Sequence, residues 1–310
     1  MLEWQIAPDN RSFEALAVIG SYIALIYWVD KDWLATHAHQ LFHLEAIEQS
    51  PALAHGWAAW NAFLVWVRPH IEFYKLFKAQ FAYAVKQAAQ AQLDEQSHHQ
   101  PMHYLGEHLM ILYGRGQLGM DDDKGLLKQF LTNANPDIRR HAIGFVGRSL
   151  EGDSDEKVPG EVVERFKKLW EVYWAGAGKK DAEEQPDAQL FGTWFASGQF
   201  PERWALEQLE QFVKVVPTPE PDHTVVEQLA KIAPRDIGRA VRILDRMVHG
   251  DREGWRVYAW LDPARQILEQ AMSAGGNART QAEQIINHLG RRGYEKLGIL
   301  LDDGRRPGGR

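Results

Sequence analysis

Residues 136–150 read PDIRRHAIGFVGRSL, which is the pattern of an amphipathic helix that packs closely against a neighbour. Pro136 and Asp137 suit the first helical turn, where the missing N–H of proline costs nothing and a carboxylate is favoured. One helical stripe then follows at three- and four-residue spacing, formed by Ile138, Ala142, Phe145, Val146 and Ser149, all apolar except the last. Small residues lie among them at Ala142, Gly144 and Gly147, so we expect another helix to approach closely here.

The same helical period continues along the chain, with almost no strand-like alternation. It predicts helices near residues 12–29, 33–48, 53–66, 70–93, 101–113, 123–133, 136–150, 160–175, 187–197, 202–213, 223–232, 235–248, 263–273, 277–289 and 293–301. Short helices joined by Pro, Asn, Asp and Gly turns are typical of HEAT-, ARM- and TPR-like repeats. The sequence therefore predicts an all-α fold, a degenerate α-solenoid of paired helices, with an irregular helical bundle as the alternative.

The domain organisation follows from the absence of a long polar linker. We expect residues 1–302 to form one continuous helical array, or alternatively two lobes of residues 1–155 and 156–302. Two polar stretches, residues 151–160 and 176–186, are short enough to be loops within the array. Residues 303–310 have the composition of a disordered tail.

Composition narrows the classes of function. The formal net charge of −7, from 42 acidic and 35 basic residues, argues against indiscriminate binding to nucleic acid or to anionic membranes. The chain has no cysteine, which excludes disulfides, thiol chemistry and thiolate zinc sites and fits a reducing cytoplasm. We therefore expect a cytoplasmic protein that binds no membrane.

One apolar run could be mistaken for a membrane segment. It reads ALAVIGSYIALIYWV, from Ala15 to Val29, and it is bracketed by Glu14 and Asp30. A spanning helix needs about 20 apolar residues, so the run is too short. We interpret it as a buried core helix.

Two histidine clusters are the only candidates for a metal site. In SHHQPMHYLGEH (97–108), His103 and Glu107 are four residues apart on one flank of a helix, with His98 and His99 just before it. In HAHQLFH (37–43), His39 and His43 share a flank, but Gln40 replaces the glutamate of a HExxH protease. Neither cluster converges three ligands, so we expect no metal and no cofactor. The least favoured alternative is a metal-dependent hydrolase built on His39, His43, His98, His99, His103 and Glu107.

Enzyme motifs fail on inspection. The stretch GAGKK (176–180) lacks the first glycine and the Ser/Thr of a phosphate-binding loop, and GRSLEG (147–152) has the wrong glycine spacing for a serine hydrolase. We therefore expect a protein that is not an enzyme.

An ordered row of arginines is the strongest binding signal. Arg235, Arg239, Arg242 and Arg246, here called the arginine ridge, fall within about 60° on a helical wheel. Like charges repel, so a partner would be an economical explanation: an acidic protein, a phosphate backbone or an acidic helix of the next repeat. The alternative is a solvated face neutralised within the fold. With Trp255, the ridge forms the candidate partner-binding set, and we expect reversal of Arg239 and Arg242 to abolish partner capture without loss of stability.

Several stretches resemble a known family. FGTWFASGQFPERWALEQLEQFV (191–213), PDHTVVEQLAKIAP (221–234) and HGDREGWRVYAWLDPARQILEQAM (249–272), with residues 103–118 and 136–150, resemble the helical carboxyl-terminal region of large bacterial STAND-type P-loop NTPases, many of them associated with anti-phage defence. The resemblance implies a superhelical sensor or scaffold that binds a protein partner and whose ATPase and effector parts lie elsewhere. This chain lacks the phosphate loop, so no nucleotide site is carried over. A nucleic-acid-binding helical repeat that uses the arginine ridge is the alternative.

Overall fold

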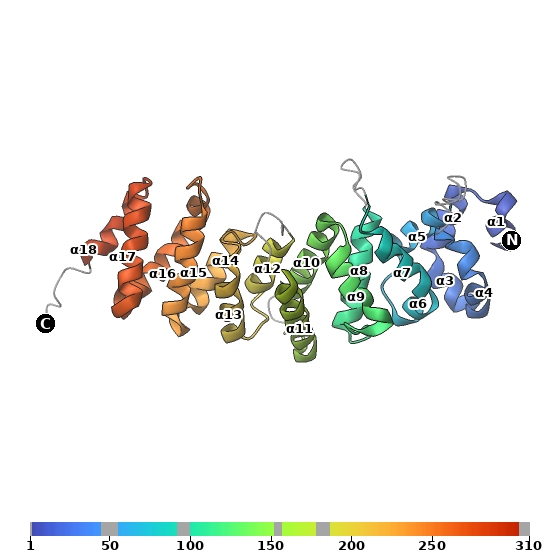
Figure 1. Ribbon diagram of the computed structural model, residues 1–310, viewed down its shortest axis with the longest axis horizontal. Helices are drawn as coiled ribbons and strands as arrows, with labels where there is room; N and C mark the ends of the chain where they lie inside the picture. Colours follow the sequence, from blue (N-terminus) through green and yellow to red (C-terminus); the bar gives the residue numbers. More distant parts are fainter. Residues whose placement is uncertain (1, 45–54, 92–99, 152–156, 178–186, 304–310) are drawn as a thin grey trace. The chain divides into compact units, whose positions relative to one another are not determined.

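The computed structural model describes residues 2–44, 55–91, 100–151, 157–177 and 187–303 (Figure 1). All regular secondary structure within these ranges is helical, which confirms the predicted all-α class of the helical-repeat or bundle type. The predicted tail lies outside the described residues from residue 304 onward, whereas Asp303 still belongs to the last helix.

The chain divides into two compact units: Met1–Ala142 with Glu164–Leu169, and Ile143–Val163 with Trp170–Arg310. The division falls within two helices: α10 is cut after Ala142, and the middle of α11, Glu164–Leu169, belongs to unit 1. Unit 1 contains α1 (Leu2–Ile6), η1 (Pro8–Asn10), α2 (Phe13–Ser21), α3 (Ile23–Val29), α4 (Lys31–Leu41), α5 (His55–Trp66), α6 (Ile71–Leu76), α7 (Lys78–Gln87), α8 (Pro101–Gly114), α9 (Asp122–Asn133) and the start of α10 (Pro136–Glu151). Unit 2 contains the rest of α10, most of α11 (Gly160–Ala177), η5 (Ala188–Leu190), α12 (Phe191–Ala196), α13 (Glu202–Phe212), α14 (Asp222–Ile232), η6 (Ala233–Arg235), α15 (Ile237–Gly250), η7 (Arg256–Trp260), α16 (Leu261–Ala274), α17 (Gly276–Arg291), η8 (Glu295–Gly298) and α18 (Ile299–Asp303).

An aromatic cluster forms the core of unit 1. Its members are almost completely buried and meet edge to face, with ring centroids 5.4 Å apart for Phe42 and Trp60 and 5.3 Å apart for Phe63 and Phe77. Such edge-to-face pairs add to the stabilisation that burial alone provides. The adjacent His108 is also buried, and its Nε2–H donates to the carbonyl oxygen of Leu64 at 3.0 Å. The core therefore accommodates an imidazole as a neutral hydrogen-bond donor.

Helix α2 packs directly along α5 in unit 1. Contact is closest at Gly20, where an added Cβ would clash with the backbone of Ala59. The inner side of α2 and α3 consists of Leu16, Ile19 and Ile23, all buried. Gly20 thus allows α2 and α5 to come this close, because a side chain at that position would clash.

The predicted helix over residues 12–29 is interrupted at Tyr22, where φ is −100° and ψ is 12°. Hydrogen bonds bridge the break: the Tyr22 N–H is shared between the Val18 and Ile19 carbonyls, and the Ile26 N–H donates to the Tyr22 carbonyl. Exposed apolar residues continue from α2 through Tyr22 into α3. A second predicted helix, over residues 70–93, is also divided, at Phe77.

Unit 2 confirms the close packing predicted for α10. An added Cβ on Gly147 would clash with Thr193, and one on Gly144 would lie 2.7 Å from the Leu190 side chain. Nearby, the Trp194 indole N–H donates to the Ile143 carbonyl at 2.7 Å. Further along the chain, α15, α16 and α17 lie side by side (Figure 1).

Candidate protein-binding surface

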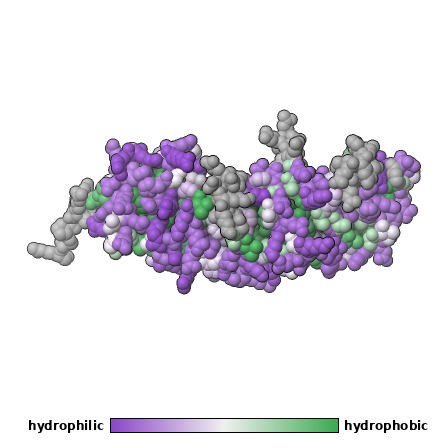
Figure 2. Space-filling model, in the orientation of Figure 1, coloured by the Kyte–Doolittle hydropathy of each residue, from purple (hydrophilic) through white to green (hydrophobic). Residues whose placement is uncertain are grey.

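The outer side of α2 and α3 carries large apolar side chains that nothing in the described part of the chain covers. Val18, Tyr22, Leu25, Trp28 and Val29, here called the apolar face, are each between 57% and 80% exposed. Four of them follow at spacings of four, three and four residues, which places them in one row along the helix. On the side drawn in Figure 2, hydrophobic residues reach the surface among hydrophilic ones over the N-terminal helices.

The interpretation of residues 15–29 as a buried core helix is therefore correct for only one side. Leu16, Ile19 and Ile23 pack inward, whereas the apolar face points to solvent. The sequence does not separate the two sides, because both are apolar and neither shows the polar stripe that normally marks a solvated helix face.

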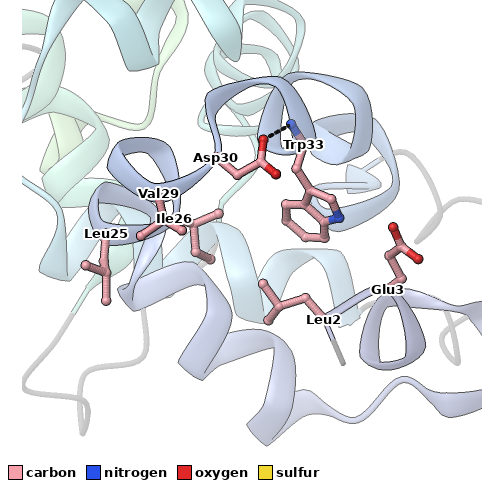
Figure 3. A pocket seen from close by; sticks show the side chains of 7 residues that line it. All are labelled: Leu2, Glu3, Leu25, Ile26, Val29, Asp30 and Trp33. Atoms are coloured by element: carbon pink, nitrogen blue, oxygen red, sulfur yellow. Dashed lines mark hydrogen bonds between the residues drawn. The ribbon is translucent and has the colours of Figure 1, made fainter.

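A groove of about 590 Å³ adjoins the apolar face. It lies between α1, α3 and the start of α4, and Figure 3 shows the Leu2, Ile26 and Trp33 side chains around a common space with the carboxylates of Glu3 and Asp30 at its edge. The Asp30 carboxylate accepts a hydrogen bond from the Trp33 N–H at 2.8 Å, which caps α4 and fixes the Trp33 position. The full lining comprises Leu2, Glu3, Leu25, Ile26, Val29, Asp30 and Trp33.

Acidic groups surround this surface. Glu14 lies one turn before Val18 and Asp30 directly follows Val29, so a carboxylate stands at each end of the row. Residues 2–41 carry five carboxylates against two basic side chains, Arg11 and Lys31. Both bases are engaged: Arg11 Nε donates to the Ile6 carbonyl, and Lys31 Nζ lies 3.6 Å from Glu72 Oε2. The apolar face is thus set in a negatively charged surround.

The arginine ridge of unit 2 is largely neutralised within the fold. Arg239 Nε lies 2.9 Å from Glu210 Oε2, and Arg242 Nε lies 2.6 Å from Glu210 Oε1. Arg235 pairs with Glu202. These carboxylates belong to α13, which packs against α15. Three of the four arginines are thus neutralised by a neighbouring helix, as in the alternative given by the sequence.

The most enclosed pair of this network is Arg239 with Glu210, whose side chains are 22% and 18% exposed. Burial opposes ionisation of Glu210, but the hydrogen bonds and charges of Arg242 and Arg239 outweigh it and lower the pKa of the Glu210 carboxyl. Arg239 has two further carboxylates within reach, Glu207 at 3.7 Å and Asp236 at 3.5 Å. The carboxylates on this side of α15 thus balance the ridge.

Two predicted binding residues, Arg246 and Trp255, lie outside the ion pairs with α13. Arg246 is exposed and has no ion-pair partner within the described ranges. Trp255 is 62% exposed, its indole N–H donates to the Glu253 carboxylate, and the guanidinium of Arg256 lies 5.8 Å from its ring centroid. On the side drawn in Figure 2, the surface over α13–α15 is predominantly hydrophilic. Trp255 has one exposed aromatic neighbour, Tyr258, which is 80% exposed and whose backbone N–H donates to the Trp255 carbonyl at 3.1 Å.

The structure separates the two pairs of candidate metal ligands. His39 and His43 approach each other, with ring centroids 5.4 Å apart. His103 instead stacks on His141 of α10 at 4.2 Å, and Glu107 Oε1 lies 2.6 Å from His141 Nε2. Among the described residues, no three or more His, Asp or Glu side chains are arranged to hold a metal ion; His98 and His99 lie outside those residues.

Glu107 thus has a partner that sequence reasoning missed. A helical spacing of four suggested His103, but the carboxylate reaches His141, 34 positions further along the chain. No local pattern identifies such a pair, because it depends on how α8 and α10 pack. Burial and the neighbouring His141 lower the pKa of His103 to about 4, so that its imidazole is neutral at pH 7.

None of the described helices combines the length and the apolar character needed to cross a membrane. No protein-family model matches the chain, and neither a curated protein nor a solved structure matches it.

Proposed function

We propose that this chain is a non-catalytic helical module that binds a protein partner, and that the apolar face of α2 and α3 is the surface it uses. The observation that supports the proposal is the exposure of five large apolar side chains in one region. Tyr22 and Trp28 alone present roughly 300 Å² of exposed surface, since an aromatic side chain offers about 150–250 Å². Apolar patches of about 300–600 Å² on soluble proteins are often functional, and this patch reaches that size.

Several features favour a protein partner over nucleic acid. Binding to phosphates requires free basic side chains, whereas three arginines of the ridge already pair with α13 carboxylates. The surround of the apolar face is acidic, which repels a phosphate backbone. Nucleic-acid binding through the ridge is therefore the weaker proposal.

The setting that we propose is the one implied by the resemblance to STAND-associated helical regions, a scaffold or sensor in bacterial anti-phage defence whose NTPase and effector parts lie on another polypeptide or domain. This part of the proposal rests on the sequence resemblance alone. A partner that is captured only after phage infection would support it.

Affinity capture from a lysate of the source cell, with and without phage infection, tests the proposed function. The wild-type chain is compared with Val18→Glu/Leu25→Glu, which places charges within the apolar face, and with Arg246→Glu, a matched surface change on α15. The proposal expects one protein to be retained by the wild type and by Arg246→Glu but lost with the double variant. Equal retention by all three chains, or loss only with Arg246→Glu, would contradict it.

A further inference from the structure

We infer that the segment which docks on the apolar face is an amphipathic α-helix with lysine or arginine at both ends of its apolar stripe. The inference rests on the proposed function and names the chemistry of the partner. It follows from the length of the apolar row, the shape of the adjoining groove and the position of the carboxylates.

The length of the row fits a helix of about three turns. Val18 and Val29 are eleven residues apart, which corresponds to about 16 Å along a helix axis. The row crosses the junction of α2 and α3 at Tyr22, which hydrogen bonds at four-residue spacing bridge on both sides. A second helix that packs along it would bury apolar residues at the same three- and four-residue spacing, which is how helices are recognised in grooves.

The groove beside the row has room for an anchoring side chain. Its volume of about 590 Å³ lies between α1 and α3, with the Trp33 ring in its lining (Figure 3). Aromatic anchors that enter pockets of this kind contribute most to the affinity of protein interfaces. We therefore expect one large apolar residue of the partner helix to enter this groove.

The carboxylates specify the ends of the partner helix. Glu14 and Asp30 are sixteen residues apart on the two successive helices, at most about 24 Å at 1.5 Å per residue, and Glu3 stands at the groove edge. Basic residues placed at that separation would meet a carboxylate at each end in either orientation. Complementary charges of this kind increase the association rate and exclude wrong partners.

A second copy of this chain fits the surface less well. An antiparallel pairing of two apolar faces would bring Glu14 of one copy to Asp30 of the other, and a parallel pairing would oppose each carboxylate to itself. Both arrangements place like charges at each end of the contact, which costs affinity. An anionic lipid surface meets the same repulsion, since Glu3, Glu14 and Asp30 all surround the apolar residues.

Two synthetic helical peptides of about 18 residues test the inference by fluorescence anisotropy. Both carry the same Leu and Trp stripe; one has lysine pairs at its two ends and the other has glutamate pairs. The wild-type chain is expected to bind the lysine peptide with a Kd of about 10–100 μM and the glutamate peptide at least tenfold more weakly, with a preference that shrinks as salt rises. Equal binding of both peptides, or no binding of the lysine peptide up to about 1 mM, would overturn the inference.

Two variants make the result specific to this surface. Val18→Glu/Leu25→Glu is expected to lose binding of the lysine peptide. Glu3→Lys/Glu14→Lys should keep the apolar row but remove the preference for the lysine peptide, because the charges at one end and at the groove edge change sign while Asp30 stays negative. If the Glu3→Lys/Glu14→Lys chain still prefers the lysine peptide, the carboxylates do not select the partner and the inference is contradicted.

Other occupants produce distinct outcomes. If the wild-type chain sediments with vesicles of anionic phospholipid and Val18→Glu/Leu25→Glu does not, the apolar face binds a membrane and not a partner helix. If the wild-type chain forms a concentration-dependent dimer and the same variant stays monomeric, the apolar face binds a second copy of this chain. If lysate capture identifies a partner that depends on Val18 and Leu25 but cross-links to it map to a segment without basic ends, the proposed function stands and this inference fails.

Discussion

The apolar face in unit 1 and the arginine ridge in unit 2 reverse the roles that their sequences suggest. The run of residues 15–29 has the composition of a core helix, yet one side of it is exposed. The ridge has the pattern of a binding surface, yet Arg235, Arg239 and Arg242 pair with carboxylates of α13. The comparison teaches that a residue pattern fixes a helical face but not its neighbour, and the neighbour decides whether that face is available for binding.

Substitutions in the arginine ridge and in α2, acid acting on a buried imidazole of unit 1, and substitutions in the apolar face are expected to change the free energy of unfolding by successively smaller amounts. The largest concerns the ridge. Arg239→Glu/Arg242→Glu would place two carboxylates beside Glu210, whose side chain is only 18% exposed. Because an enclosed charge then loses its partners and gains like charges, we expect a loss of about 3 kcal/mol in urea unfolding. The outcome is opposite to the sequence-based expectation of unchanged stability.

Arg246→Glu is the matched control for that experiment. Its side chain is exposed on the same helix without an ion-pair partner in the described ranges, so a change within about 0.5 kcal/mol is expected. If both variants unfold at the wild-type urea concentration, the ridge is not neutralised by α13 and regains its standing as a binding surface.

The two sides of α2 should differ strongly in their tolerance of substitution. Gly20→Ala adds a methyl group against the Ala59 backbone, which cannot move aside locally, and we expect a cost of about 2–3 kcal/mol. Val18→Ala, two residues earlier on the exposed side, should change stability by less than about 0.5 kcal/mol. Chemical denaturation of the two variants would measure the difference, and equal costs would mean that the outer side is also packed.

Acid should weaken unit 1 through a buried imidazole. Burial lowers the pKa of His108 to about 4, although its hydrogen bond to Leu64 and the charge of Glu107 act in the opposite direction. Below the unfolded pKa of about 6.5, the His108 side chain of the unfolded chain binds a proton that the folded chain does not bind. The free energy of unfolding therefore decreases as the pH is lowered from about 6.5 to about 4, and it is constant below that. We expect a loss on the order of 2 kcal/mol across this window, and a clearly smaller loss in His108→Gln. Unfolding curves recorded at several pH values measure it; identical slopes in both chains would exclude His108 as the cause.

The smallest effect on stability is expected for Val18→Glu/Leu25→Glu. Both side chains are more than half exposed, so charging them should shift the free energy of unfolding by no more than about 0.5 kcal/mol each. Thermal and urea unfolding check this directly. A large destabilisation would show that the apolar face is an internal packing surface. Loss of partner capture in this variant would then result from unfolding and not from loss of a binding surface.

Most of the fold could be predicted from the sequence. The period of apolar residues located nearly all the helices, and Ala142, Gly144 and Gly147 correctly marked a close helix contact. These features depend on residues within a few turns of each other, which a linear pattern records. The breaks at Tyr22 and Phe77 were missed because neither position carries Gly or Pro.

The candidate site could be predicted far less well. Arg239 and Glu210 are 29 positions apart and Glu107 and His141 are 34 apart, so only helix packing reveals that they meet. The apolar face was missed for a different reason: residues on both sides of α2 and α3 are apolar, and a pattern of that kind predicts burial on both. Exposure had to be measured in the structure.

Site-specific photo-cross-linking tests whether the apolar face is the surface that contacts the partner. A photoreactive amino acid is placed at Leu25 in one chain and at Arg246 in another, and each chain is irradiated in a lysate of the source cell. If the apolar face binds the partner, one protein adduct forms from position 25, is absent when Val18→Glu is added, and does not form from position 246. An adduct from position 246 alone would contradict it, because the binding surface would then lie on α15 rather than on the apolar face.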